Sequence, residues 1–285
     1  MAKIMVMAEI ALTVVLLVGA GTFVRAVDIV LSQPTAGTSH ATQVLTADVL
    51  LPPAAYADDA RRIRFFDAVI EHLHQQAGVV DATASDTVPG AVLGSHESFS
   101  LPGQPEPTDG WPRAQMGIVD PHFLATYGVR LREGRFFDAR DRMDSAPVAV
   151  VDAKMAAAMW PHGDALGRTL VLWPGRTQAR RLTVIGVIES LQLDRLLERS
   201  LPGLLLPLDQ SVGQGPLHDV GVALRMHADA RRFEPQLVDA VRAVDPQAAV
   251  YDVRSQAAAV AEGRVYLTVL TSVFGALGLV ALLLA

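Results

Sequence analysis

The 285-residue sequence contains no cysteine. This absence excludes disulfide bonds, cysteine nucleophiles and zinc sites built from thiolates. It fits an oxidising compartment, but many cytosolic proteins also lack cysteine, so the compartment has to be argued from the layout of the chain. An excess of positive charge is missing too, because the formal net charge is -6 and the arginines are dispersed. The electrostatic signature of a nucleic-acid-binding protein is therefore absent.

The common sequence motifs of catalysis are also missing. The chain has no Gly-x-x-x-x-Gly-Lys-Ser/Thr loop for ATP, no Gly-x-Ser-x-Gly elbow and no His-Glu-x-x-His pair. Gly19-Ala20-Gly21 lies in an apolar segment with no strand before it, so close helix packing explains it better than dinucleotide binding. We therefore expect that the protein is not an enzyme, and we assign no catalytic, cofactor-binding or metal-binding residue.

Two histidine-containing motifs invite a functional interpretation. His72 and His74 are two residues apart on a predicted helix, so their side chains face different directions. A solvated helix face is the favoured interpretation, ahead of a metal-binding pair. His96-Glu97-Ser98 resembles part of a hydrolase site, but we place it in a loop rich in Gly, Ser and Pro, with no partner nearby in the sequence.

Three aspartates recur at every third position, at Asp138, Asp141 and Asp144. Such spacing is compatible with a calcium-binding loop. The interleaved Arg140 and Arg142, together with the missing glycine and distal glutamate, favour a charge-compensated turn instead.

Two apolar segments bracket the chain, and they account for much of its mean hydropathy of +0.30. The first runs from Ile4 to Val24, and the second, without a charged residue, from Tyr266 to Ala285. Each is roughly 20 residues long, the length with which an α-helix crosses about 30 Å of hydrocarbon. A helix can do so because it satisfies its own backbone hydrogen bonds. We expect a folded domain on one side of a membrane, anchored at both ends.

Several points about these anchors stay open. Lys3 and the small residues 19–21 are compatible with a cleaved signal peptide, although the apolar run exceeds the usual length of about 7–15 residues. The flanking charges do not determine the orientation. Because the chain stops inside its last apolar run, we expect the natural sequence to continue beyond Ala285.

Between the anchors, a small and polar stretch at residues 32–40 has the composition of a linker. Hydrophobic periodicity then predicts the same strand–helix–strand order twice. The predicted elements are a strand at 43–51, a helix at 57–76 and a strand at 79–84, and then a strand at 220–226, a helix at 229–244 and a strand at 249–253.

The two predicted helices share short sequences. Both open with Asp-Ala-Arg-Arg, at residues 59–62 and 229–232, and both later contain Asp-Ala-Val, at residues 67–69 and 239–241. This favours an internal duplication whose two units share one sheet with the helices on one face, a split βαβ arrangement. The alternative is a chance recurrence, because strand–helix–strand order is common in α/β chains.

The region between the copies, residues 89–208, is richer in Pro, Gly and short strands, and we interpret it as an inserted mixed α+β subdomain. An exposed loop is expected at residues 101–112 because of its four prolines. The predicted strands are 114–119, 148–151, 169–172 and 182–188, and the predicted helices are 121–127 and 153–160.

Several motifs, in order along the chain, resemble those of MacB/FtsX-type ABC transporter permeases. They are residues 8–21 (Glu9 among them), Val119-Asp120-Pro121-His122-Phe123, Arg132-Glu133-Gly134-Arg135-Phe136-Phe137, Val148-Ala149-Val150-Val151-Asp152, Met159-Trp160-Pro161, Thr183-Val184-Ile185-Gly186-Val187 and Val250-Tyr251-Asp252-Val253. The chain as a whole is similar to a MacB-like periplasmic core domain with its flanking helices.

The resemblance implies an α+β fold with a porter-like subdomain, residues 41–88 and 209–255, and the insertion at 89–208. It implies a transmembrane helix and its exit at residues 1–31, a periplasmic core domain at 32–262, and the truncated start of a second transmembrane helix at 263–285. It further implies a bacterial inner-membrane protein, a nucleotide-binding ATPase partner and a dimeric assembly of permease repeats. The linker at 32–40 departs from the Asp-Pro-Gly-Phe-like segment of the family.

The implied function is that of a permease subunit, without a cofactor of its own, which couples ATP-driven motion of membrane helices to a periplasmic domain. This coupling is called mechanotransmission, and efflux is one use of it. We expect a tilt of the two helices relative to each other to shear the domain, through an uninterrupted helix at residues 254–264. Gly263 is its weak point, costing about 1 kcal/mol relative to Ala. The alternative is a membrane-tethered extracytoplasmic sensor or binding module without transport activity.

Overall fold

The computed structural model describes residues 36–91, 95–191, 201–211 and 220–262, with ten further residues of the two end segments. Residues 35–259 form one compact unit. The two predicted membrane-spanning segments lie almost wholly outside the described residues. Within the described part of the chain, none of the helices combines the length and the apolar character that a membrane span requires.

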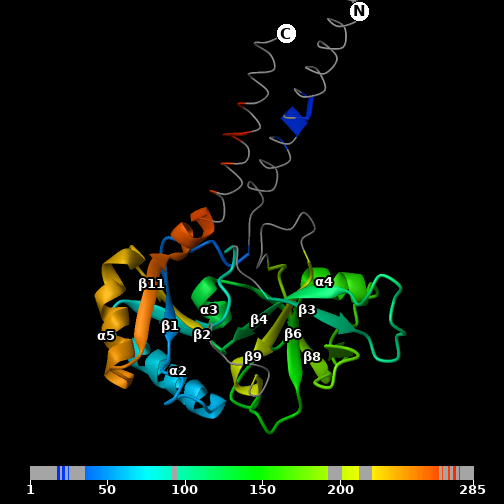
Figure 1. The fold of residues 1–285 in the computed structure, drawn as a ribbon, viewed down its shortest axis with the longest axis horizontal. Helices are drawn as coiled ribbons and strands as arrows, with labels where there is room; N and C mark the ends of the chain where they lie inside the picture. Colours follow the sequence, from blue (N-terminus) through cyan, green and yellow to red (C-terminus); the bar gives the residue numbers. More distant parts are fainter. Residues whose placement is uncertain are drawn as a thin grey trace, which may run out of the picture. The chain divides into compact units, whose positions relative to one another are not determined.

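The predicted duplication is present, and its two copies are interlocked in one antiparallel sheet with the strand order β11-β1-β10-β2 (Figure 1). Each copy leaves a gap between its strands that is filled by a strand of the other copy, which confirms the split βαβ arrangement. The first copy consists of β1 (Val44–Leu50), α2 (Asp59–His74) and β2 (Val79–Ser85), and the second of β10 (Gly221–Met226), the 3₁₀ turn η2 (Ala230–Phe233), α5 (Glu234–Val244) and β11 (Ala249–Ser255). We call this the duplicated lobe.

The alternation of side chains along β1 places its two faces in two different cores. Leu45, Ala47 and Val49 are buried against α2 and α5 in one hydrophobic cluster. Val44 points the other way, into a second cluster that contains Phe123 of α3 (Phe123–Tyr127). Both helices of the duplication therefore cover one face of the sheet, as predicted, and α3 packs on the other.

Of the two sequences that the helices share, one occupies equivalent positions in both copies and the other does not. In Asp-Ala-Val, Val69 and Val241 are both 0% exposed on the inner faces of α2 and α5. The shared Asp-Ala-Arg-Arg is not equivalent, because Asp59 is the first residue of α2 whereas Asp229 caps η2 by accepting from the N–H of Arg231. The predicted helix at 229–244 is therefore a 3₁₀ turn followed by an α-helix that starts at Glu234.

The insertion forms the mixed α+β region that was predicted, here called the inserted lobe. Its strand pairings close into a ring, β4-β3-β7-β8-β6-β9 and back to β4, with β5 paired to β8. The elements besides α3 are β3 (Ser95–Ser100), β4 (Arg113–Val119), β5 (Leu131–Gly134), β6 (Val148–Asp152), α4 (Ala153–Met159), β7 (Thr169–Leu172), β8 (Arg180–Ile188), β9 (Gly203–Pro207) and η1 (Leu208–Gln210).

The four predicted strands and two predicted helices of the insertion are confirmed, and residues 102–110 of the predicted loop are exposed. Three strands were missed. β3 and β5 are short and polar, and β9 is a five-residue run, so none carries a clear period-two signal. Placing His96-Glu97-Ser98 in a loop was wrong, because these residues lie in β3 and Glu97 accepts a hydrogen bond from the Trp173 indole over 2.6 Å.

The two lobes share little backbone pairing but a common core. β2 and β4 are paired in register only at Ser85 and Val119. Around this point, Val44 and Ala223 of the duplicated lobe pack with Phe123 and Leu205 of the inserted lobe in one buried cluster. Hydrophobic burial rather than sheet continuity therefore joins the lobes.

Both ends of the compact unit leave it at the same place. Leu45 at the start of β1 is paired with Ser255 at the end of β11, and the N–H of Ala257 donates to the carbonyl of Ala41 over 2.9 Å. The fully buried side chain of Gln256 donates to the carbonyl oxygens of Gly37 and Pro89 over 2.8 and 2.9 Å. The incoming and outgoing segments are thus fastened to each other.

This arrangement changes two expectations for the connecting segments. Residues 36–40 of the predicted linker form packed turns, and a Cβ on Gly37, whose φ is +78°, would lie 2.9 Å from the Pro89 ring. The helix predicted at 254–264 starts at residue 256, because β11 continues to Ser255, whose hydroxyl accepts from the N–H of Ala258. It is helical through residue 262, and Gly263 lies outside the described residues.

A buried carboxylate predicts a pH dependence of the folding stability. Asp152 caps α4, accepting from the N–H of Met155 over 2.7 Å, and burial raises its pKa from 3.8 to about 6. Because the pKa of Asp152 is higher in the folded than in the unfolded state, its protonated carboxyl stabilises the fold below about pH 4. This contribution is lost as the pH rises through about 6. Asp152→Asn keeps a capping oxygen without the charge.

We expect Asp152→Asn to be more stable relative to wild type at pH 7.5 than at pH 4, by about 1–3 kcal/mol. Denaturant unfolding of both proteins at the two pH values measures this, and the double difference cancels other titrating groups. The same stability difference at both pH values would contradict the assignment.

Candidate functional site

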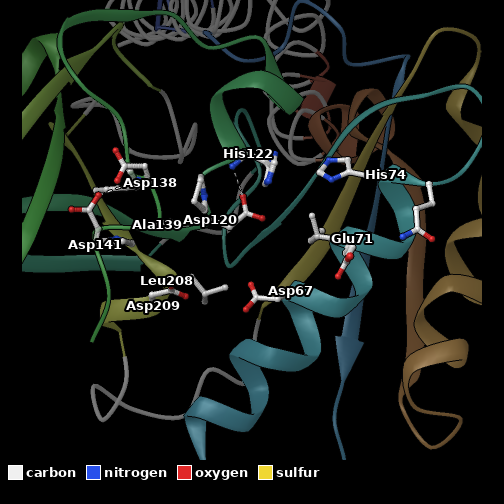
Figure 2. Close-up of a pocket in the computed structure, with 15 residues that line it drawn as sticks. Asp67, Glu71, His74, Asp120, His122, Asp138, Ala139, Asp141, Leu208 and Asp209 are labelled. Carbon is white, nitrogen blue, oxygen red and sulfur yellow. Dashed lines mark hydrogen bonds between the residues drawn. The ribbon is translucent and has the colours of Figure 1, made fainter. Parts of the chain in front are cut away.

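A pocket of about 530 Å³ lies between α2 of the duplicated lobe and the turns of the inserted lobe (Figure 2). Its polar lining is dominated by acidic side chains and two histidines. These residues are Asp67, Glu71, His74, Asp120, His122, Asp138, Asp141 and Asp209. A pocket of this character attracts cations rather than anions.

Asp120 forms the buried floor of this pocket, and it joins the lobes. It directly follows β4, and its carboxylate accepts from the Thr83 hydroxyl and from the N–H of Ala84, both on β2, the latter over 2.9 Å. It also accepts from the N–H of His122 over 2.9 Å, which turns the chain into α3. Burial raises its pKa to about 6 in spite of these three hydrogen bonds.

Beside Asp120, three side chains converge from separate segments. His74 is the last residue of α2, Asp81 lies in β2, and His122 precedes α3. Nε2 of His74 lies 2.8 Å from Oδ1 of Asp81, and Nδ1 of His122 lies 3.2 Å from the same oxygen. The two imidazole centroids are 4.6 Å apart. We call this the His–Asp–His cluster.

The cluster shifts the pKa values of two of its members. Burial acts to raise the pKa of Asp81, but its hydrogen bonds with His122 and His74 outweigh burial and lower it. The hydrogen bond with Asp81 raises the pKa of His122. Both directions follow from the attraction between a carboxylate and an imidazolium.

The opposite wall of the pocket holds the aspartate turn considered in the sequence. Arg135 donates to both carboxylate oxygens of Asp141 over 2.7 and 2.8 Å, and Arg140 pairs with Asp138 over 2.7 Å. This confirms a charge-compensated turn, although Asp141 is paired with Arg135 rather than with the interleaved Arg142. Below it, burial and then the charge of Asp209 raise the pKa of Asp67.

His74 is exposed, as the prediction of a solvated helix face requires. Its ring also contacts His122 and Asp81, which the sequence did not indicate. His72 takes no part in the cluster, so the two histidines do not act as a pair. The cluster was missed because its three members come from three elements, and no spacing along one helix or strand reveals them. The sequence signal that could have indicated the cluster is the Asp120-Pro121-His122 turn, which places a histidine just after the end of β4.

The architecture is thus that of an α+β domain in which a duplicated split βαβ lobe carries an inserted lobe. The family described as MacB-like periplasmic core domain matches residues 4–240. The chain belongs to this family.

One solved structure supports this fold, and two more are similar with lower TM-scores. The periplasmic region of MacB from Actinobacillus actinomycetemcomitans is similar with a TM-score of 0.52 and 15% identity, over 76% of this chain and 91% of that one. The extracellular domain of the noncanonic ABC-type transporter YknZ from Gram-positive bacteria (73% and 100% covered) and a domain of a putative permease protein from Porphyromonas gingivalis (76% and 93%) each have a TM-score of 0.45 and 15% identity. Among curated proteins, none matches.

The hydrogen bonds of Asp120 predict a stability defect. Asp120→Ala leaves three donors without their acceptor, and we expect it to lower the free energy of unfolding by about 2–5 kcal/mol. Asp120→Asn keeps one acceptor oxygen and should cost less. Denaturant unfolding at pH 7.5 measures both, with Asp109→Ala in the exposed loop as the control. Equal stability of Asp120→Ala and Asp109→Ala would refute this role.

Proposed function

We propose that the chain is part of the permease subunit of an ABC transporter in the inner membrane of a bacterium. In this proposal, the apolar segments anchor it in the bilayer and the described domain lies outside the cytoplasm. Family membership supports this, because the match begins at residue 4, inside the first apolar segment. The likeness in fold to the periplasmic region of MacB supports it as well.

The observation that carries the mechanism is the fastening of the two ends of the domain. β1 and β11 are paired from Leu45–Ser255 to Leu50–Ala249, and Gln256 and Ala257 bind the incoming segment. Separating the two ends would break several backbone hydrogen bonds at once, together with those of the fully buried Gln256 amide, which are costly to leave unpaired. We therefore replace the expected shear by a joint motion, in which both membrane helices displace the domain as one body.

The source of the motion, in this proposal, is a separate nucleotide-binding ATPase. The chain lacks the phosphate-binding loop that would let it hydrolyse ATP itself. Movement in the cytoplasm would pass through the membrane helices to the domain, in a dimer of permease repeats, and efflux is one use of such movement. The domain would carry no catalytic activity of its own.

The topology predicts which cysteines an impermeant reagent can reach. Because the chain has no native cysteine, each introduced one is reported alone. Glu106→Cys in the exposed loop should react with a membrane-impermeant maleimide in intact spheroplasts, and Lys3→Cys only after lysis. Labelling of Glu106→Cys only after lysis would contradict an extracytoplasmic domain.

The coupling is tested on the full-length protein purified from the membrane of its host. We expect an ABC-type ATPase to copurify with it in stoichiometric amount. Hydrolysis of ATP by this complex should be lost when the lysine in the phosphate-binding loop of the ATPase is replaced. If the protein instead purifies without an ATPase and its chain continues into a cytoplasmic signalling segment, it is a tethered sensor, the alternative from the sequence.

A further inference from the structure

The His–Asp–His cluster has the chemistry of a metal site. The three ligand atoms are Nε2 of His74, Oδ1 of Asp81 and Nδ1 of His122, and all lie within 4.8 Å of one another. Among the described residues, they form the one group of three such side chains that is close enough to share an ion. Two imidazoles and one carboxylate suit Zn²⁺ and related transition metals, whereas Ca²⁺ and Mg²⁺ prefer oxygen ligands alone.

Two of the three separations between these atoms can be compared with those that an ion requires. Zn–N bonds of about 2.0–2.1 Å place neighbouring ligand atoms of a tetrahedral site about 3.3 Å apart. The distances from Oδ1 of Asp81 are 2.8 Å to His74 and 3.2 Å to His122. The separation at His122 is close to the tetrahedral value, and the one at His74 is shorter than that value.

Two neighbouring groups lie close to Nε2 of His74. The N–H of Ala82 donates over 2.9 Å to Oδ1 of Asp81 and lies 3.2 Å from Nε2 of His74. The contact of 2.8 Å between Nε2 of His74 and Oδ1 of Asp81 is a hydrogen bond, and a bound metal ion would take the place of the proton that the two atoms share.

The surroundings hold the ligands in place and leave one side open. Asp81 is 15% exposed in its side chain, and the hydrogen bond from the N–H of His122 to Asp120 fixes the turn that presents the His122 ring. Both histidines line the acidic pocket, where Glu71 and Asp67 add negative charge (Figure 2). An ion bound here would have three protein ligands and a fourth position facing the pocket.

We propose that His74, Asp81 and His122 bind a divalent transition-metal ion, with Zn²⁺ the best match. Two ligands belong to the duplicated lobe and the third to the connection between β4 and α3 of the inserted lobe. The ion therefore ties the lobes together beside their single registered strand pair, Ser85 and Val119. This inference rests on the cluster alone and is independent of the proposed function.

The test uses the purified full-length chain after treatment with EDTA, with ZnCl₂ as the probe. We expect one Zn²⁺ per chain by mass spectrometry of the metal content after gel filtration. At a hundredfold excess over the dissociation constant, Zn²⁺ should raise the melting temperature by about 5 °C. CoCl₂ should give visible absorption bands of a tetrahedral or five-coordinate site, which report ligation directly.

Three variants and one control decide which residues bind the metal. His74→Gln, Asp81→Asn and His122→Gln should each weaken Zn²⁺ binding at least about tenfold. The two histidines line the pocket and Asp81 lies partly buried beside them, and circular dichroism verifies that the variants fold. His162→Gln, an exposed histidine outside the cluster, should bind Zn²⁺ like wild type.

Three results would overturn the proposal. The first is the absence of bound Zn²⁺, in which case the cluster holds only a proton. The second is equal Zn²⁺ affinity of wild type and the three variants. The third is equal thermal protection by CaCl₂, which would assign the binding to the acidic pocket rather than to the histidines.

Discussion

The fold depends on the pairing of β1 with β11 and β10. β1 belongs to the first copy of the duplication, yet both of its neighbours belong to the second. Neither copy can therefore complete its own sheet, because the gap between its strands is filled by the other. Since the copies are separated in sequence by the whole inserted lobe, this long-range pairing closes the compact unit and brings its two ends together.

The same pairing limits how force can enter the domain. The incoming and outgoing segments are joined by backbone hydrogen bonds and by the buried Gln256 amide. A displacement of one segment is shared by the other before it reaches the core. The inserted lobe then follows, because the buried cluster around Phe123 and Leu205 and the carboxylate of Asp120 hold it to the sheet. A metal ion at His74, Asp81 and His122 would stiffen that junction further.

The duplicated lobe could be predicted from the sequence because its signals are local. Ile63, Phe66, Ile70 and Leu73 recur at helical spacing in α2, and a strand signal precedes and follows each helix. The family resemblance rested on motifs that the structure explains in part. In Val-Asp-Pro-His-Phe, Asp120 binds across to β2 and Phe123 enters the core between the lobes.

What the sequence could not predict depends on contacts between distant segments. β5 is exposed along its whole length and is defined by its pairing with β8, so its own composition indicates no strand. The ring closes through β4 and β9, which are parallel and far apart in the chain. The helical spacing around His74 indicated its exposure but not its neighbours, because Asp81 and His122 reach it from two other elements.

The central claim is that the two ends of the domain stay together while the protein works. Thr46 and Arg254 are direct partners on β1 and β11, so a cysteine at each position is within reach of a disulfide. The decisive measurement is the rate of ATP hydrolysis by the membrane-reconstituted complex that carries this cysteine pair, first oxidised and then reduced. The control is the same complex with a Ser98→Cys/Arg113→Cys pair, which joins β3 to β4. Joint motion predicts the same rate in all four states. Loss of activity on oxidation of the 46/254 pair alone, with recovery on reduction, would show that the ends separate and would contradict the account.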